Sequence, residues 1–175
     1  MVSGRDLGRA RPLTLWAIAV AGSVLAGCSI EPRTDREESA ADGPASGAPD
    51  KEVVDVPGVA SLPVFSSAIR SGDFIFLSGA IGTVPGEELQ LVEGGIGSET
   101  RQTLENLSDV IEAAGGTMED MVKCTVFLAD MDDYEAMNEV YLEFFPSDPP
   151  ARSALAAAGL AFDARVEIEC IAAAR

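Results

Sequence analysis

Three side chains near the end of the chain have types and spacing suited to chemistry. Arg152 interrupts a run of small apolar residues in the segment PPARSALAAAGL, and Glu167 and Glu169 alternate with apolar residues in RVEIECIAA. This alternation predicts a strand with both carboxylates on one face. A guanidinium can bind a carboxylate through two parallel hydrogen bonds. A carboxylate in apolar surroundings holds its proton more strongly unless a cation or hydrogen bonds compensate.

The face that carries the two glutamates also carries Ile171, and Phe127 of another predicted strand matches it. A face exposed only to solvent would also expose these apolar side chains. We therefore expect this face to lie at a subunit interface or a cleft.

Composition excludes several classes of function. The chain of 175 residues has 12 Lys and Arg against 29 Asp and Glu, a net charge of −17, and no His. Such a surface repels nucleic acid, because phosphate binding needs clustered cations. The absence of His removes His-based triads and His-type zinc sites, so proton transfer falls to a carboxylate, a hydroxyl, a thiol, a lysine or water. Three cysteines are too few to predict a disulfide framework.

The first residues are typical of a bacterial lipoprotein. Three arginines precede an apolar stretch over residues 13–26, which is short for a spanning helix and ends in LAGC. We predict a signal peptide over residues 1–27 and lipidation of Cys28, with an uncleaved anchor or a misassigned start codon as alternatives. Ser29 after the cysteine resembles outer-membrane sorting, so we expect a lipid-anchored protein of the bacterial cell envelope that faces the periplasm.

Two segments follow the predicted signal peptide. Residues 29–56 are rich in Ser, Ala, Pro, Gly, Asp and Glu and contain no aromatic residue. Such a composition buries too little apolar surface to fold, so we predict a disordered tether over residues 28–56 and a folded domain over residues 57–175.

The pattern of residues 57–175 predicts elements in the order ββαβαββ. These would form an α/β sandwich whose mixed sheet carries two helices on one face. Ser98 is expected to cap the first helix, and the second begins at Asp132 or Asp133 and ends at Phe145. Residues 82–97 read mostly as loop. The expected strands cover residues 63–69, 73–81, 121–130, 151–158 and 165–173, with a hairpin at RSGD.

Three stretches resemble the Rid family, also called YjgF-like proteins. They are SGAIG, the long segment from GGIGSETRQ through PPARSAL, and VEIECIA, which together cover almost the whole domain. The resemblance implies a chorismate-mutase-like fold, a homotrimer with clefts between adjacent subunits, and reactive enamine/imine deaminase activity without a metal or organic cofactor.

The resemblance also implies roles for particular residues. Arg152 would grip the substrate carboxylate and Glu167 would position the attacking water. Asn138 and Ser78 match shared cleft residues, although they could equally be a helix-surface amide and a strand-end hydroxyl.

The chain departs from the family at three cleft positions. Phe65 stands where a tyrosine is frequent, Ala80 where glutamine is common, and Ala154 where many members have a cysteine. A thiol intermediate is therefore excluded, and hydrolysis must proceed without one. Cys124 and Cys170 are expected on the face opposite Glu167, as buried small hydrophobes rather than reactive thiols.

We expect a hydrolytic deaminase that converts 2-imino acids or enamines to 2-keto acids and ammonia, and that needs no cofactor because an iminium carbon is already electrophilic. The alternative is a non-catalytic lipoprotein that binds a carboxylate metabolite or a partner. A carboxylate binder needs only the arginine, so the presence of Glu167 favours catalysis. A chorismate mutase shares the fold by analogy only, and few cations are available for its dianionic substrate.

Overall fold

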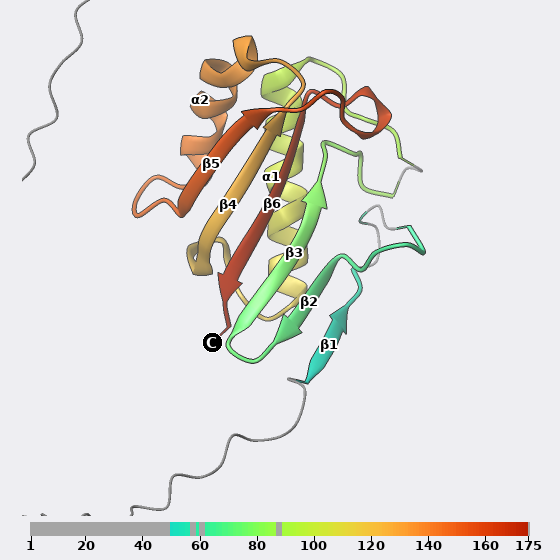
Figure 1. The fold of residues 1–175 in the computed structure, drawn as a ribbon, viewed down its shortest axis with the longest axis vertical. Coiled ribbons are helices and arrows are strands. Elements are labelled where there is room, and N and C mark those ends of the chain that lie inside the picture. The colour runs from blue at the N-terminus through green and yellow to red at the C-terminus, as the bar shows by residue number, and fades with distance from the viewer. Residues whose placement is uncertain (1–49, 57–58, 60–61, 87–88, 175) are drawn as a thin grey trace, which may run out of the picture. The chain divides into compact units, whose positions relative to one another are not determined.

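The computed structural model describes residues 50–56, 59, 62–86 and 89–174. These residues form one six-stranded mixed sheet with two helices on one face (Figure 1). The helices are α1 (Ile96–Ala113) and α2 (Tyr134–Phe144). The strands are β1 (Lys51–Val54), β2 (Ala68–Ser71), β3 (Phe74–Ala80), β4 (Met121–Leu128), β5 (Ala151–Ala156) and β6 (Val166–Ala173).

The order of strands across the sheet is β1-β2-β3-β6-β4-β5. Only β4 and β5 run parallel, and α2 lies between them in the sequence; the other neighbours are antiparallel. The predicted hairpin at RSGD is confirmed, because β2 pairs with β3 across a turn in which Gly72 has a φ of 57°. A positive φ carries no steric cost for glycine. The predicted α/β fold with a mixed sheet and two helices on one face is thus confirmed.

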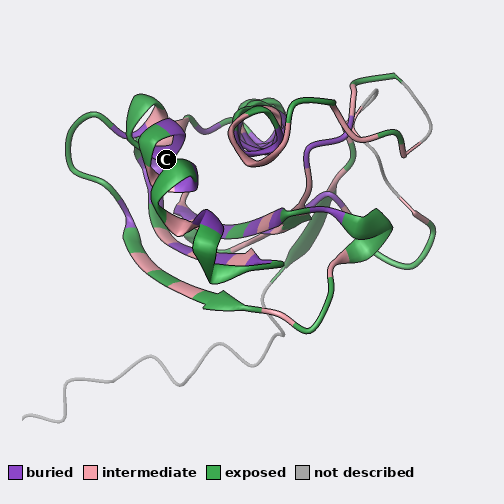
Figure 2. Cartoon of the chain, turned by 90° about the horizontal axis from the view of Figure 1, so that it is seen from above, coloured by how far each residue is buried: buried purple, intermediate pink, exposed green. Residues whose placement is uncertain are grey.

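The core lies between the sheet and the helices. Helix α1 places Leu104, Leu107 and Ile111 against β3 and β6, as its helical spacing predicts. Viewed from above, both helices lie on the same face of the sheet, and buried residues alternate with more exposed ones along the strands (Figure 2). Neither helix covers the opposite face, which we call the open face; Phe74, Phe76 and Leu155 lie on it and are 44–47% exposed.

Three details of the predicted elements are wrong. A strand, β1, forms at Lys51–Val54 inside the predicted tether, because it adds to the sheet edge by pairing with β2. The strand expected over residues 63–69 begins only at Ala68, after a turn closed by the Phe65 N–H and the Leu62 carbonyl. Helix α1 begins at Ile96 after Gly95, so Ser98 lies within the helix instead of capping it.

The two cysteines of the domain are joined. Cys124 of β4 and Cys170 of β6 are directly paired residues, buried on the helix side, and linked by a disulfide with an S–S distance of 2.02 Å. The predicted burial and face are confirmed, but the interpretation as separate small hydrophobes is wrong. The alternation within β4 and β6 indicated the shared face; the sequence alone did not reveal that the two residues are opposite each other.

No helix among the described residues is long and apolar enough to cross a membrane. The predicted signal peptide and Cys28 lie outside the described residues, as does most of the predicted tether.

A candidate active site divided between two faces of the sheet

Arg152 projects from β5 toward α2. Its Nη2 donates a hydrogen bond to the hydroxyl of Tyr134, 3.1 Å away, at the start of the helix. Asn138, one turn later, also hydrogen-bonds Tyr134, and this bond together with the Arg152 charge lowers the pKa of the tyrosine. Ala154, two residues beyond Arg152 on the same face of β5, packs against the core. The structure therefore brings Arg152, Asn138 and Ala154 together in one region, which we call the arginine half-site.

The ring of a second tyrosine, Tyr141, packs against the face of the guanidinium. The guanidinium carbon lies 4.6 Å from the centroid of the Tyr141 ring, within the range of a cation–π interaction. Tyr141 is buried, and burial raises its pKa to about 12. Its hydroxyl has no hydrogen-bond partner, so Tyr141 contacts Arg152 through its ring. Neither Tyr134 nor Tyr141 was among the site residues that the sequence predicted.

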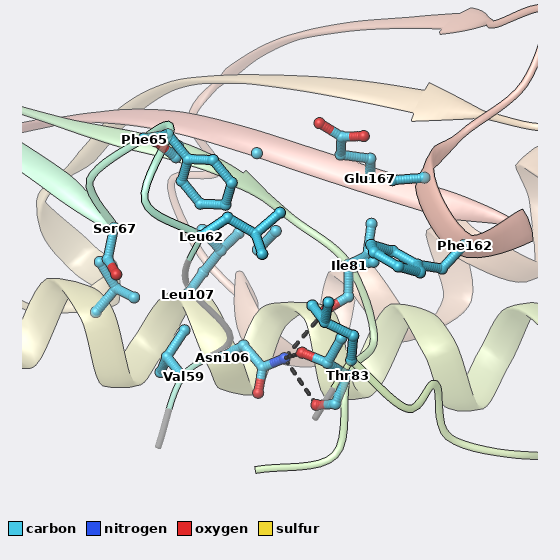
Figure 3. A pocket seen from close by; sticks show the side chains of 16 residues that line it. Val59, Leu62, Phe65, Ser67, Ile81, Thr83, Asn106, Leu107, Phe162 and Glu167 are labelled. Atoms are coloured by element: carbon cyan, nitrogen blue, oxygen red, sulfur yellow. Dashed lines mark hydrogen bonds between the residues drawn. The ribbon is translucent and has the colours of Figure 1, made fainter. Parts of the chain in front are cut away.

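Glu167, on β6, lies beside a hollow of about 160 Å³. The hollow is bounded by the end of β3, by α1 and by the segments before β2 and β6 (Figure 3). Gly79 lies directly beneath the Glu167 carboxylate, where any Cβ would collide with it. The register of β3 against β6 shifts between Leu77 and Ala80, so the pairing of these two strands is irregular at this point. We call this region the glutamate half-site.

Desolvation and the nearby charge of Glu169 raise the pKa of Glu167 above its usual range. Both effects disfavour the ionised carboxylate. A carboxylate of this kind is a better proton acceptor than an ordinary surface glutamate, so it suits general base catalysis.

Two more predicted site residues line the same hollow. Ser78 donates a hydrogen bond to the Ser66 carbonyl, at 2.7 Å, and Phe65 places its ring opposite Glu167 (Figure 3). The sequence prediction missed Ser67, which is 6% exposed and whose hydroxyl has no partner. No sequence signal distinguished it from its neighbour Ser66.

The Arg152 and Glu167 side chains lie on opposite faces of the sheet. Arg152 pairs with Cys124, which pairs with Cys170, so all three share the helix side. Glu167 pairs with Phe127, which pairs with Leu155, and these share the open face. One small substrate cannot reach both groups of the same chain across the sheet.

A separate ion pair links the segment before β6 to the segment before α2. Arg165, just before β6, donates from Nε and Nη2 to the carboxylate of Asp133, just before α2, at 3.0 and 2.7 Å. Its backbone N–H also donates to the buried Glu99 carboxylate, at 2.7 Å. These contacts fix the start of β6, and therefore the position of Glu167, relative to both helices.

No cluster of three or more His, Cys, Asp or Glu able to hold a metal occurs among the residues that the structure describes. The chemistry that these two half-sites can perform is carboxylate binding and acid–base catalysis on water.

Residues 58–174 match the protein family described as Endoribonuclease L-PSP. A mouse protein named 2-iminobutanoate/2-iminopropanoate deaminase is 42% identical over 113 residues, which are 65% of this chain and 83% of the mouse protein. The solved structure of the E. coli YjgF gene product is 31% identical with a TM-score of 0.66, over 71% of this chain and 99% of that one. The structure of E. coli TdcF with bound serine is 29% identical with a TM-score of 0.67, over the same shares.

Proposed function

The chain belongs to the Rid, or YjgF-like, family, and on that premise we propose that it is a hydrolytic deaminase of 2-imino acids and their enamine tautomers. The substrate carries a carboxylate beside an electrophilic imine carbon. An arginine that binds the first and a glutamate that activates water toward the second are what this reaction requires. The products are a 2-keto acid and ammonia.

We propose further that the active site forms between adjacent copies in a homotrimer. The observation that supports this is the separation of Arg152 and Glu167 onto opposite faces of one sheet. The open face beside Glu167 carries Phe76, Leu155 and other half-exposed apolar side chains, which a second copy would cover. A neighbouring copy packed there would bring its own arginine half-site to the glutamate half-site.

The proposed steps balance as a hydrolysis. Arg152 of one copy binds the substrate carboxylate through its planar fork. Ionised Glu167 of the next copy takes a proton from water as the water oxygen bonds to the imine carbon. The proton then passes to the imine nitrogen, which gives a carbinolamine. Glu167 next takes the proton of the new hydroxyl and delivers it to the amino nitrogen, the carbon–nitrogen bond breaks, and ammonia leaves as the carbonyl forms. General base catalysis of this kind contributes on the order of 10²–10⁴-fold.

Two other functions fit less well. The family description names an endoribonuclease, but a net charge of −17 opposes binding of RNA. A non-catalytic carboxylate-binding protein needs Arg152 but gives no role to Glu167, whose pKa is raised beside a hollow.

We propose that the protein is exported and anchored to the outer membrane through a lipid on Cys28. The disulfide supports export, because such bonds persist in oxidising compartments and are rare in the cytosol. It also accounts for the three cysteines: two are paired, and the third is the cysteine of LAGC. A Cys28→Ser protein should lose its lipid and leave the membrane fraction; unchanged membrane association of this variant would refute the lipoprotein assignment.

The deaminase proposal is tested by ammonia release while an amino-acid oxidase generates imines in the presence of catalase. Arg152→Ala should lose about 2–5 kcal/mol of transition-state stabilisation, and Arg152→Lys should rescue only part, because lysine lacks the fork. Glu167→Gln should keep carboxylate binding and lose turnover. Mass and melting temperature are measured on the same variants, and wild-type activity in an intact Arg152→Ala assembly would exclude this role.

A further inference from the structure

We propose that the hollow beside Glu167 receives the side chain of the substrate, and that the preferred substrates are 2-imino acids with apolar side chains of about isobutyl to benzyl size. This inference rests on the proposed deaminase function and specifies its substrate class.

The walls of the hollow are mainly apolar. Leu107 and Val110 of α1 form one side, Ile81 follows β3, and the rings of Phe65 and Phe162 lie nearer Glu167 (Figure 3). None of the described residues that line it is Lys or Arg. A substrate carboxylate would therefore find no cation inside, whereas an apolar group would leave water for apolar contacts.

The size of the hollow sets the size of the group. An apolar protein cavity of about 150 Å³ can bind benzene, and this hollow has a volume of about 160 Å³. A methyl group would leave most of that volume empty. An isobutyl, thioether or benzyl group would fill it.

The position of Glu167 sets the orientation of the substrate. Its carboxylate lies over Gly79 at one end of the hollow, and the amide of Asn106 lies at the other (Figure 3). Water activated by Glu167 must attack the imine carbon at the first end. The substrate carboxylate then points out toward the arginine of the neighbouring copy, and the side chain on the next carbon points inward.

The polar atoms inside the hollow are poor partners for a charged side chain, because the Asn106 amide is already hydrogen-bonded. The Asn106 Nδ2 donates to the Ile81 and Thr83 carbonyls, both at 3.0 Å, and its Oδ1 accepts from Gln102 Nε2. Ser67 is different, because its buried hydroxyl has no partner. A neutral side chain with one weak acceptor, such as a thioether, is compatible with this lining; a second carboxylate is not.

The first experiment compares substrates with the full-length protein. An amino-acid oxidase with catalase generates imines from alanine, leucine, methionine, phenylalanine and glutamate at matched flux, and the acceleration of ammonia release is measured. We expect the leucine-, methionine- and phenylalanine-derived imines to exceed the alanine-derived one by about tenfold or more in kcat/KM. Equal or faster hydrolysis of the alanine- or glutamate-derived imine would overturn the inference while leaving the deaminase function intact.

The second experiment fills the hollow. Val110→Phe should slow the leucine-derived imine at least tenfold relative to the alanine-derived one. Val140→Phe is the matched control, since Val140 is also largely buried but lies on α2 outside the hollow; it should leave the ratio unchanged. An unchanged ratio in a folded Val110→Phe protein would refute the side-chain site.

A binding measurement covers the case in which Val110→Phe does not fold or no imine is hydrolysed. The wild-type melting temperature is followed with pyruvate and with 4-methyl-2-oxopentanoate, since a ligand that binds the folded state stabilises it. Greater stabilisation by the larger keto acid supports the hollow as its site, and equal or smaller stabilisation refutes it. Absence of hydrolysis for every imine in an intact assembly would overturn the deaminase proposal, and the keto-acid comparison would still decide the role of the hollow.

Discussion

The guanidinium of Arg152 donates a hydrogen bond to the Tyr134 hydroxyl, 3.1 Å away, in a region of the chain where most neighbours of the arginine are apolar. The ring of Tyr141 lies beneath the same guanidinium at 4.6 Å. One tyrosine thus fixes the edge of the planar group and the other its face. Two tyrosines of one helix therefore orient the arginine, one through its hydroxyl and the other through its ring.

This arrangement predicts that replacing tyrosine with phenylalanine has different effects at the two positions. Tyr134→Phe removes the acceptor that orients Arg152, and we expect KM to rise about threefold to tenfold with little change in kcat. Tyr141→Phe keeps the ring and removes a hydroxyl that has no partner, so KM should not change and the melting temperature should not fall. Steady-state kinetics of both variants check this. Equal rises in KM would show that the hydroxyl of Tyr134 has no special role.

The raised pKa of Glu167 predicts the acidic limb of the pH profile. As a base, Glu167 must be ionised, so kcat/KM should fall as pH drops through a pKa above the ordinary glutamate range. Glu169→Gln removes the like charge that contributes to the raised pKa, and the limb should move to lower pH. A shift to higher pH would contradict this assignment.

The same pKa has a consequence for stability. Folding raises the pKa of Glu167, so its contribution favours the folded state at low pH and is lost as pH rises through the folded pKa. Glu167→Gln should therefore not lower the melting temperature at neutral pH, although it lowers turnover. This combination distinguishes a catalytic glutamate from one that holds the fold together.

The apolar open face predicts an assembly. Leu155 is 44% exposed on that face, and Leu142 is 60% exposed on α2. Leu155→Asp should break the trimer and abolish deaminase activity, because a charge would be buried at the contact. Leu142→Asp should leave both intact. Light scattering checks the mass, and a monomeric wild-type protein at micromolar concentration would refute the shared site.

The disulfide predicts a stability difference. Cys124 and Cys170 are 46 residues apart in the sequence, so their bond restricts the unfolded chain. The double variant Cys124→Ala/Cys170→Ala should lose about 2–5 kcal/mol of stability, or roughly 10 °C or more in melting temperature. A thiol count on the purified full-length protein should find no free thiol at these two positions. Two free thiols at those positions would remove this support for export.

The sequence predicts the fold well where one local pattern decides it. Leu104 and Leu107 repeat at helical spacing, and Val166 and Ile168 alternate with the glutamates, so α1 and β6 lie close to their predicted ranges. The start of α1 was misplaced because Gly95 ends the preceding loop before Ser98 can cap the helix. Strand β1 could not be predicted, since its partner is β2 and its own composition resembles that of a tether.

The candidate site was only partly predictable for a similar reason. Arg152 and Glu167 stand out as charges among apolar residues, and their roles rest on family resemblance. Tyr134, Ser67 and the apolar hollow depend on contacts between distant segments, which no local pattern encodes. The assignment of Arg152 to the helix side required the register of β5 against β4.

The central claim, a site shared between copies, is tested most directly by mixing two inactive variants. Arg152→Ala and Glu167→Gln proteins are unfolded together in equal amounts, refolded into mixed trimers, and assayed for ammonia release. If each site takes its arginine from one copy and its glutamate from the next, about a quarter of the sites in random trimers are intact, and about a quarter of wild-type activity should return. If both groups act from the same chain, no mixed trimer contains an intact site, and activity at the level of the separate variants would contradict the account.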